Sequence, residues 1–398
     1  MVNTLPAVLI GGPPHAGKSV LFYSLTHALR GLGIRHHAIR ACPDGEGNWT
    51  QESDAETVSQ IRIKIEGDWP DDYVKRICLD LEHRCLPLLV DVGGKPKESQ
   101  MCILRQCTHS LLLLRADQPD YTRLWQGWTA ESNLLPLAKI YSQLQGTSTI
   151  TDQTPFLEGT LTGLERHNTT LLTGQLFDAL VERIATLFNS YSPKELEKAF
   201  FEQAPTELVI DLYASLQALA PSSTRWEPEM LVPLLASLPG HTAMSVYGAG
   251  PLWVYGAVAA HSDQEAFYQF DPRLPLGWIR PIPLSISTDS THSTEQFPEM
   301  LVHPRAYQDV TVLSIQIPTK HLNYFQPEPL PFPPVHTDAG LIIDGITPAW
   351  LLTSLVRLYQ AAGVAWIAVY YPPRKKAIVV YSRVEIQKPG DLVVMPGE

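Results

Sequence analysis

Gly12-Pro-Pro-His-Ala-Gly17-Lys18-Ser19 fits the phosphate-binding pattern GxxxxGK[ST] at each fixed position. A short apolar run at residues 7–10 precedes it, as expected for a buried parallel strand. Apolar residues at helical spacing follow it over residues 21–32. Because the pattern requires a strand before the loop and a helix after it, this stretch predicts a P-loop domain of the α/β class.

The residues of the loop have separate tasks in this pattern. Glycines let backbone N–H groups close around the β-phosphate, while Lys18 reaches the β- and γ-phosphates and the Ser19 hydroxyl holds Mg²⁺. A chance glycine turn is the alternative, and the flanking strand and helix patterns argue against it. We therefore predict ATP and Mg²⁺ as cofactors, with the nucleotide held by Gly12, His15, Ala16, Gly17, Lys18 and Ser19.

An aspartate at the end of a predicted strand fits the same site. The apolar residues 86–90 end in Asp91, which is followed by Gly93 and Gly94. A carboxylate at the end of a buried strand can meet Mg²⁺ through water, so Ser19 and Asp91 form the predicted metal site. A solvated aspartate at a strand end is the alternative. No further base or arginine finger is evident, so the sequence leaves a kinase and an ATPase both open.

Strand and helix patterns alternate throughout the first 195 residues. Helical stripes at residues 74–81 and 176–188 accompany apolar runs at 86–90 and 111–114. This alternation predicts a parallel sheet covered by helices on both faces, in a domain spanning residues 1–195. Beyond it, tryptophan, tyrosine and proline become common, and residues 285–295 and 326–334 are predicted boundaries or long loops.

The second half contains an internal repeat. Met244-Ser-Val-Tyr-Gly248-Ala-Gly250-Pro251-Leu-Trp253 aligns with Leu341-Ile-Ile-Asp-Gly345-Ile-Thr-Pro348-Ala-Trp350. Glycine, proline and tryptophan match at one offset of 97 residues (residue 350 against residue 253). Each copy predicts a strand, a glycine turn and a helix, with further strands at residues 208–212 and 266–270 or 310–317 and 365–370. We therefore predict two tandem α+β domains over residues 205–300 and 307–398.

The glycine turn of each copy is a candidate anion site. Proline suits a helix start, glycine permits close approach of a ligand, and free N–H groups with the helix dipole attract anions. A tight turn without a ligand is the alternative. The predicted ligand-binding residues are Gly248, Ala249, Gly250, Pro251 and Trp253 in the first copy and Gly345, Thr347 and Arg374 in the second.

The first copy continues to Asp271-Pro272-Arg273, and this combination of motifs resembles the third family of CRISPR-associated ring nucleases. These are small α+β (ferredoxin-like) proteins of type III CRISPR systems, and fusions with a P-loop (AAA-like) ATPase domain are a known architecture. The resemblance covers roughly residues 205–398. It implies that the chain binds and cleaves cyclic oligoadenylate, in particular cyclic tetra-adenylate, as a phosphodiesterase, with Mn²⁺ as an option for cleavage.

The resemblance also implies catalytic residues. His261 would move a proton, Asp271 would orient it or hold a metal, and Arg273 would clamp a phosphate. The second copy departs from the pattern, because Thr347 replaces a glycine and Tyr371-Pro-Pro-Arg374 replaces Asp-Pro-Arg. We therefore expect it to be a degenerate copy that keeps the fold and ligand contacts without the acid/base pair.

Composition limits the partners. A net charge of −11 argues against binding duplex nucleic acid, which needs a broad basic face. The sequence has no run of 18 apolar residues, and its five cysteines show no CxxC spacing. We expect a cytoplasmic protein with reduced thiols and no membrane partner, which forms a homo-oligomer or a ligand-induced assembly.

Three functions remain open from the sequence. The first is a ring nuclease coupled to an ATP-binding domain. The second is a sensor that binds the cyclic messenger without cutting it and whose ATPase or assembly responds. The third is a P-loop small-molecule kinase in which the repeats bind a substrate or partner.

Overall fold

The computed structural model describes residues 5–42, 53, 69, 71–94, 98, 101–165, 171–191, 193–263, 266–274, 277–287, 300–318, 322, 324 and 330–396. The chain forms two compact units. Met1–Phe200 and the short segment Pro272–Gly277 make up the first, and Phe201–Asp271 and Trp278–Glu398 make up the second. No helix in the described part combines the length and apolar character that crossing a bilayer requires.

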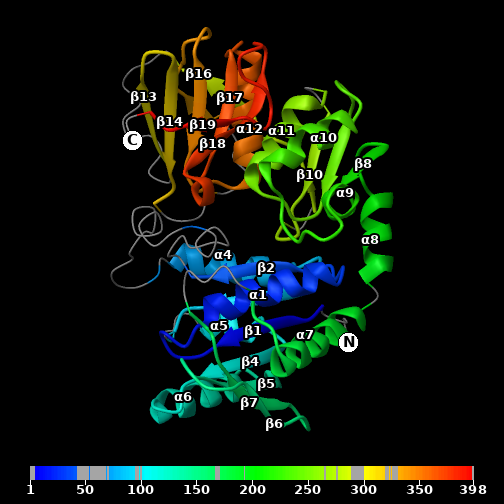
Figure 1. The fold of residues 1–398 in the computed structure, drawn as a ribbon, viewed down its shortest axis with the longest axis vertical. Coiled ribbons are helices and arrows are strands. Elements are labelled where there is room, and N and C mark those ends of the chain that lie inside the picture. The colour runs from blue at the N-terminus through cyan, green and yellow to red at the C-terminus, as the bar shows by residue number, and fades with distance from the viewer. Residues whose placement is uncertain are drawn as a thin grey trace. The chain divides into compact units, whose positions relative to one another are not determined.

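A seven-stranded sheet forms the centre of the first unit (Figure 1). Its order is β2-β3-β1-β4-β5-β7-β6, and all neighbours are parallel except the hairpin pair β6 and β7. The strands are β1 (Ala7–Gly11), β2 (His37–Ala41), β3 (Leu88–Val92), β4 (His109–Leu114), β5 (Leu135–Ser142), β6 (Thr149–Asp152) and β7 (Leu157–Leu161). The central strands are buried along their whole length because helices cover both faces.

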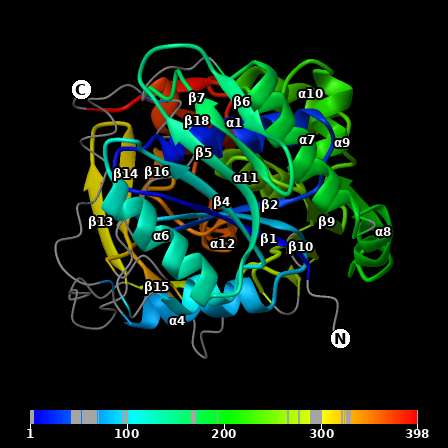
Figure 2. The ribbon, with the colours of Figure 1, turned by 90° about the horizontal axis from the view of Figure 1, so that it is seen from below.

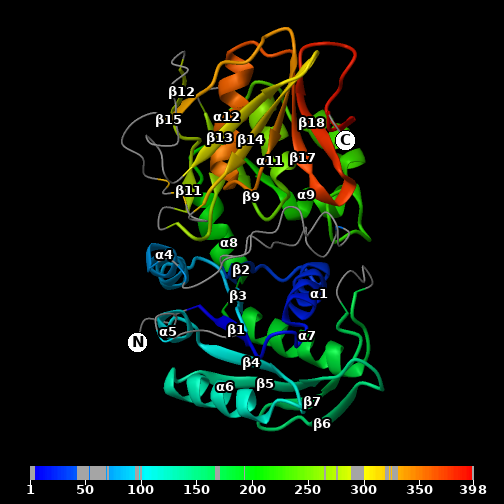
Figure 3. The ribbon, with the colours of Figure 1, turned by 90° about the vertical axis from the view of Figure 1, so that its left-hand side faces the viewer.

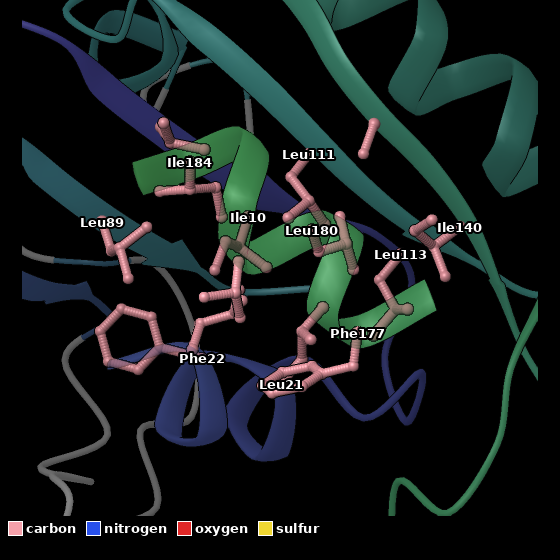
Figure 4. Packing of buried hydrophobic residues seen from close by; sticks show 14 of the residues in the cluster. Ile10, Leu21, Phe22, Leu89, Leu111, Leu113, Ile140, Phe177, Leu180 and Ile184 are labelled. Atoms are coloured by element: carbon pink, nitrogen blue, oxygen red, sulfur yellow. The ribbon is translucent and has the colours of Figure 1, made fainter. Parts of the chain in front are cut away.

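Two helix layers enclose this sheet (Figures 2 and 3). The helices of these layers are α1 (Lys18–Gly31), α4 (Asp71–Glu82), α5 (Met101–Arg105), α6 (Pro119–Glu131) and α7 (Gln175–Asn189). Helix α8 (Pro193–Glu202) follows α7, and none of its described residues belongs to the two core clusters. Helices α1 and α7 pack on one face through residues such as Leu21, Phe177 and Leu180 (Figure 4). Helices α4, α5 and α6 pack on the other. The predicted parallel α/β sheet, covered on both faces, is therefore confirmed.

The strand that carries Asp91 lies next to the P-loop strand. Here β3 pairs directly with β1, with Ile10 opposite Asp91. The AAA-like part of the resemblance stays a prediction for this unit.

The first repeat copy forms a four-stranded sheet in the second unit. Its order is β11-β10-β9-β8, with β8, β9 and β10 parallel and β11 antiparallel. The elements are β8 (Leu208–Asp211), α9 (Leu212–Leu219), the 3₁₀ turn η2 (Pro228–Met230), α10 (Leu231–Ala236), β9 (Met244–Tyr247), α11 (Leu252–His261), β10 (Phe267–Phe270) and β11 (Trp278–Ile279). The Asp211 side chain accepts hydrogen bonds from the first amides of α9 and so fixes the start of that helix.

The second copy forms a six-stranded sheet of order β13-β14-β16-β17-β18-β19. Strands β14, β16 and β17 are parallel, and the outer strands are antiparallel to their neighbours. The elements are β13 (Leu301–Ala306), β14 (Val310–Gln316), β16 (Gly340–Asp344), α12 (Ala349–Ala361), β17 (Trp366–Tyr371), η3 (Pro372–Arg374), β18 (Lys376–Ser382) and β19 (Leu392–Val394).

The two segments expected to be loops also contain paired residues. Strand β12 (Leu284–Ile286), at the start of the first segment, pairs in parallel with β15 (Leu330–Phe332) in the second segment. Residues 288–295 and 326–329 of these predicted loops fall outside the described residues.

Neither sheet has the predicted ferredoxin-like arrangement. A ferredoxin-like split βαβ unit places another strand between the two strands that its helix connects. Here the connected strands β9 and β10 pair directly, and so do β16 and β17. Each copy is therefore built on a direct parallel crossover, and that expectation was wrong.

The two copies pack together through α11 and α12. A Cβ atom added at Gly256 would lie 3.4 Å from Val356 and 3.7 Å from Leu352, so glycine allows the helices to approach closely. Further along, the Gln360 side chain donates to the Ala260 carbonyl at 3.0 Å. Because partner residue numbers rise together along both helices, α11 and α12 run parallel.

Candidate functional site

The P-loop follows β1 and requires glycine at two positions. Gly12 has a φ of +147°, and a Cβ there would lie 1.9 Å from the Leu113 carbonyl oxygen. Gly17 has a φ of +90° at the start of α1, and a Cβ there would lie 2.6 Å from Leu164. Both conformations disfavour other residues, so the fixed glycines of the pattern are explained by the backbone path.

Lys18 is buried inside the curve of the loop. Its Nζ donates to the Gly12 carbonyl at 2.9 Å and to the Pro13 carbonyl at 2.8 Å. Ala16 packs into the core, so its contribution to a ligand is limited to its backbone. His15 has a φ of +60° and lines the cavity beside Gly17. A phosphate entering the loop would replace the carbonyl partners of the lysine.

Asp91 and Ser19 lie close together, as predicted, and Arg40 joins them. The Arg40 Nη1 donates to Ser19 Oγ at 3.0 Å and lies 3.1 Å from Asp91 Oδ2. The sheet creates this arrangement, because Arg40 on β2 is paired in register with Asp91 on β3. Sequence reasoning missed Arg40, since nothing in the local sequence shows that its strand lies beside β3.

These groups line one cavity of about 320 Å³, which is large enough for a small ligand. Lys18, Ser19, Arg40 and Asp91 supply its polar groups, and Gly94 closes it, since a Cβ there would lie 2.4 Å from the Pro14 nitrogen. A hydroxyl and a carboxylate are hard oxygen ligands of the kind that Mg²⁺ prefers. A guanidinium already contacts both oxygens, so the donor set fits a cation.

The glycine turns of the two repeats share a backbone conformation that favours glycine. Gly248 has a φ of +102°, and a Cβ there would lie 2.7 Å from the Tyr213 ring. Gly345 has a φ of +133°, and a Cβ there would lie 2.1 Å from the Ile315 carbonyl oxygen. A helix begins directly after each turn, with Pro251 or Pro348 at the N-cap and no side-chain cap. Both helix starts therefore keep amide N–H groups that can donate hydrogen bonds to an anion.

The predicted ligand residues around the turns differ in exposure. Ala249 and Gly250 are partly exposed, whereas Trp253 is 1% exposed and packs against Tyr371. The Trp253 ring is thus part of the packing between the copies and cannot stack on a base. Thr347 is buried, and its Oγ1 makes no hydrogen bond to the described residues.

Arg374 is tied to the first copy. Its Nη2 donates to Glu227 Oε2 at 2.9 Å, and this hydrogen bond raises the pKa of Arg374 above its ordinary value. Glu227 also accepts from Arg225 at 2.6 Å. The guanidinium is half exposed, so it can still meet a ligand at the surface.

His261 and Asp271 lie at opposite edges of their sheet. The His261 carbonyl accepts from the His241 amide at 2.9 Å, and Nε2 lies 3.2 Å from the Leu238 carbonyl, so the histidine sits beside the residues that precede β9. Asp271 is buried directly after β10, which runs parallel to β9. Four residues of β10 separate the two edges, about 13 Å at the usual rise of a strand.

The predicted catalytic pair is therefore not brought together within this chain. The reason is the parallel crossover, which returns the end of α11 to the amino ends of the strands, whereas Asp-Pro-Arg follows their carboxyl ends. Arg273 lies in the short segment Pro272–Gly277, which groups with the first unit, and it is partly exposed.

Comparisons with known proteins bear on both units. No curated protein matches the chain. Among solved structures, twelve chains match. One of them is the crystal structure of the signal recognition particle receptor FtsY from Elizabethkingia anophelis, at 13% identity and a TM-score of 0.27. That match covers 46% of this chain and 66% of the FtsY chain, just under two thirds.

A family model matches the C-terminal part. Residues 315–394 match the family described as CRISPR-associated protein (Cas_csx3). The match falls on the second repeat copy, from the end of β14 to β19, although the motif that suggested the resemblance lies in the first. Over these residues the C-terminal part of the chain is therefore similar to the Csx3 family of CRISPR-associated proteins.

Proposed function

We propose that the chain binds cyclic oligoadenylate, with cyclic tetra-adenylate as the preferred ring, through the two glycine turns of its second unit. The supporting observation is the parallel packing of α11 and α12. Because both helices start at their glycine turns, parallel packing places the two turns at the same end of the helix pair. Two helix N-termini on one surface attract phosphates, and a cyclic tetranucleotide has a matching near two-fold symmetry.

The first unit would bind ATP with Mg²⁺ in the P-loop cavity. Lys18 and the loop amides would hold the phosphates, while Ser19 and Asp91 would hold the metal directly or through water. Mg²⁺ would neutralise phosphate charge there. We propose that the two units are coupled in one direction: ring binding changes the ATPase activity or the assembly of the chain.

Thr347 offers a direct test of the ring surface. Thr347→Val keeps the shape of a buried side chain and removes a hydroxyl that has no partner among the described residues, so the fold should be retained. We expect binding of cyclic tetra-adenylate to weaken about tenfold, as loss of one phosphate hydrogen bond would cause. Thr337→Val is the matched control, because Thr337 is exposed near the opposite end of β16.

Titration calorimetry with the full chain would measure these affinities. An unchanged affinity in Thr347→Val, or equal losses in both variants, would contradict a ring site at the turn of the second copy.

Ring cleavage is the second candidate function. One observation favours it: Asp271 follows the carboxyl end of β10, at the same sheet edge as the Gly248 turn. The distance between Asp271 and His261 argues against the two acting as one acid/base pair in a single chain. Cleavage would therefore need Asp271 with another proton-transfer group, such as one from a second copy of the chain in a homo-oligomer.

The variant Asp271→Ala tests whether the chain cleaves the ring as a nuclease or only binds it as a sensor. If the carboxylate acts in cleavage, the variant should lose at least about a hundredfold in rate while keeping most of its affinity. Product chromatography of labelled cyclic tetra-adenylate, with and without Mn²⁺ and ATP, would measure this rate. No cleavage by the unaltered protein, together with tight binding, would favour the sensor.

A further inference from the structure

The Arg40 guanidinium lies between the two oxygens of the predicted metal site. One atom, Nη1, donates to Ser19 Oγ at 3.0 Å and is 3.1 Å from Asp91 Oδ2. The Arg40 and Asp91 side chains are 14% and 4% exposed, so water screens this pair poorly. A buried carboxylate needs a cationic partner, and here Arg40 supplies that charge.

We propose that Arg40 is a positioning residue that replaces Mg²⁺ in the nucleotide-free protein and leaves these oxygens when the metal arrives with the nucleotide. This inference rests on the proposed binding of Mg·ATP by the first unit. The guanidinium occupies the space between the two oxygens that would hold the metal, so the two cations compete for Ser19 Oγ and Asp91 Oδ2. Arg40 lines the same cavity as Lys18, and a phosphate is a strong alternative partner for an arginine.

The strand register makes this exchange specific to Arg40. Arg40 and Asp91 are opposite each other on the parallel strands β2 and β3, so the backbone holds the two side chains side by side. Ser19 lies in the first turn of α1, directly after the loop. A purely structural ion pair would stabilise the fold and would have no effect on how strongly nucleotide binding depends on metal.

The test compares ATP affinity of the full chain in EDTA and in Mg²⁺. Arg40→Gln removes the charge, which should weaken metal-free ATP binding, because Asp91 then repels the phosphates. The same change should strengthen Mg·ATP binding, because no guanidinium has to be displaced. The dissociation constant in EDTA divided by the one in Mg²⁺ should therefore be at least about tenfold larger in Arg40→Gln than in the unaltered protein.

Arg105→Gln is the matched control. Arg105 makes an exposed ion pair with Glu131 at 3.1 Å, away from the residues that line the cavity, so its ratio should equal that of the unaltered protein. An unchanged ratio in Arg40→Gln would overturn the inference and leave the proposed nucleotide binding intact. If the unaltered protein binds no ATP in either buffer, both the proposed function of the first unit and this inference fail.

A second measurement does not depend on the folding of Arg40→Gln. Mn²⁺ binding to the unaltered protein can be followed by water-proton relaxation. We expect ATP to add a bound Mn²⁺ that the nucleotide-free protein lacks, because Arg40 holds the P-loop site until nucleotide arrives. Tight binding of Mn²⁺ to the nucleotide-free protein, with no gain on adding ATP, would overturn the inference.

Discussion

Arg357 holds the two repeat copies together at the end of α11. From α12, its guanidinium donates to the Asp263 carbonyl at 2.8 Å, to Ser262 Oγ at 3.1 Å and to the Ala259 carbonyl at 3.4 Å. It also lies 5.7 Å from the centre of the Phe267 ring. Hydrogen bonds from a charged donor contribute about 1.5–3 kcal/mol each. Two well-formed bonds at the low end of this range predict that Arg357→Ala destabilises α11 by about 3 kcal/mol.

Hydrogen exchange of the α11 amides in the full chain measures this effect locally. A loss of about 3 kcal/mol corresponds to roughly a hundredfold faster exchange if the helix opens as a unit. Arg305→Ala is the control, because Arg305 is exposed on β13, and its exchange rates should match those of the unaltered protein. Less than about a threefold change in Arg357→Ala would refute the idea that the copies form one packed body through this side chain.

Three further predictions concern the first unit. Gly12→Ala should destabilise it by about 3 kcal/mol, because the new Cβ would meet backbone atoms. The control Gly127→Ala, on the exposed face of α6, should stabilise it by about 0.5–1 kcal/mol. Thermal unfolding distinguishes the two variants. Burial, with the nearby Arg30 charge, lowers the pKa of His36 to about 3, so the unfolded chain takes up a proton below pH 6.5 and the folded chain does not. Stability should be complete above pH 6.5 and fall by about 2 kcal/mol by pH 5, and urea unfolding should show no such fall in His36→Phe. Lys18→Ala should weaken ATP binding at least about tenfold in a fluorescence titration, and parental affinity in this variant would mean that the loop is not a nucleotide site.

The sequence was most informative where local geometry determines the residue type. The P-loop pattern follows from positive φ angles at Gly12 and Gly17, and the repeated turns follow from those at Gly248 and Gly345. Strands at the predicted places around both turns are present as well, because short apolar runs and β-branched residues fit buried parallel strands.

Sequence reasoning failed where the answer depends on which strands are neighbours. Arg40 reaches Asp91 through the pairing of β2 with β3, which no local pattern reveals. His261 and Asp271 are close in sequence, but a parallel crossover places them at opposite sheet edges. Trp253 was predicted to contact a ligand, whereas the recurrence of tryptophan at residues 253 and 350 reflects burial at equivalent places in the core.

The most direct measurement of the central claim is the affinity of the full chain for cyclic tetra-adenylate, compared with linear tetra-adenylate and duplex DNA at physiological salt. A net charge of −11 argues against the broad basic face that duplex binding needs, whereas a small ring needs only local donors. We expect tight binding of the ring, at least about tenfold weaker binding of the linear form, and negligible binding of the duplex. Equal affinity for the ring and the duplex, or no binding of the ring, would contradict the account.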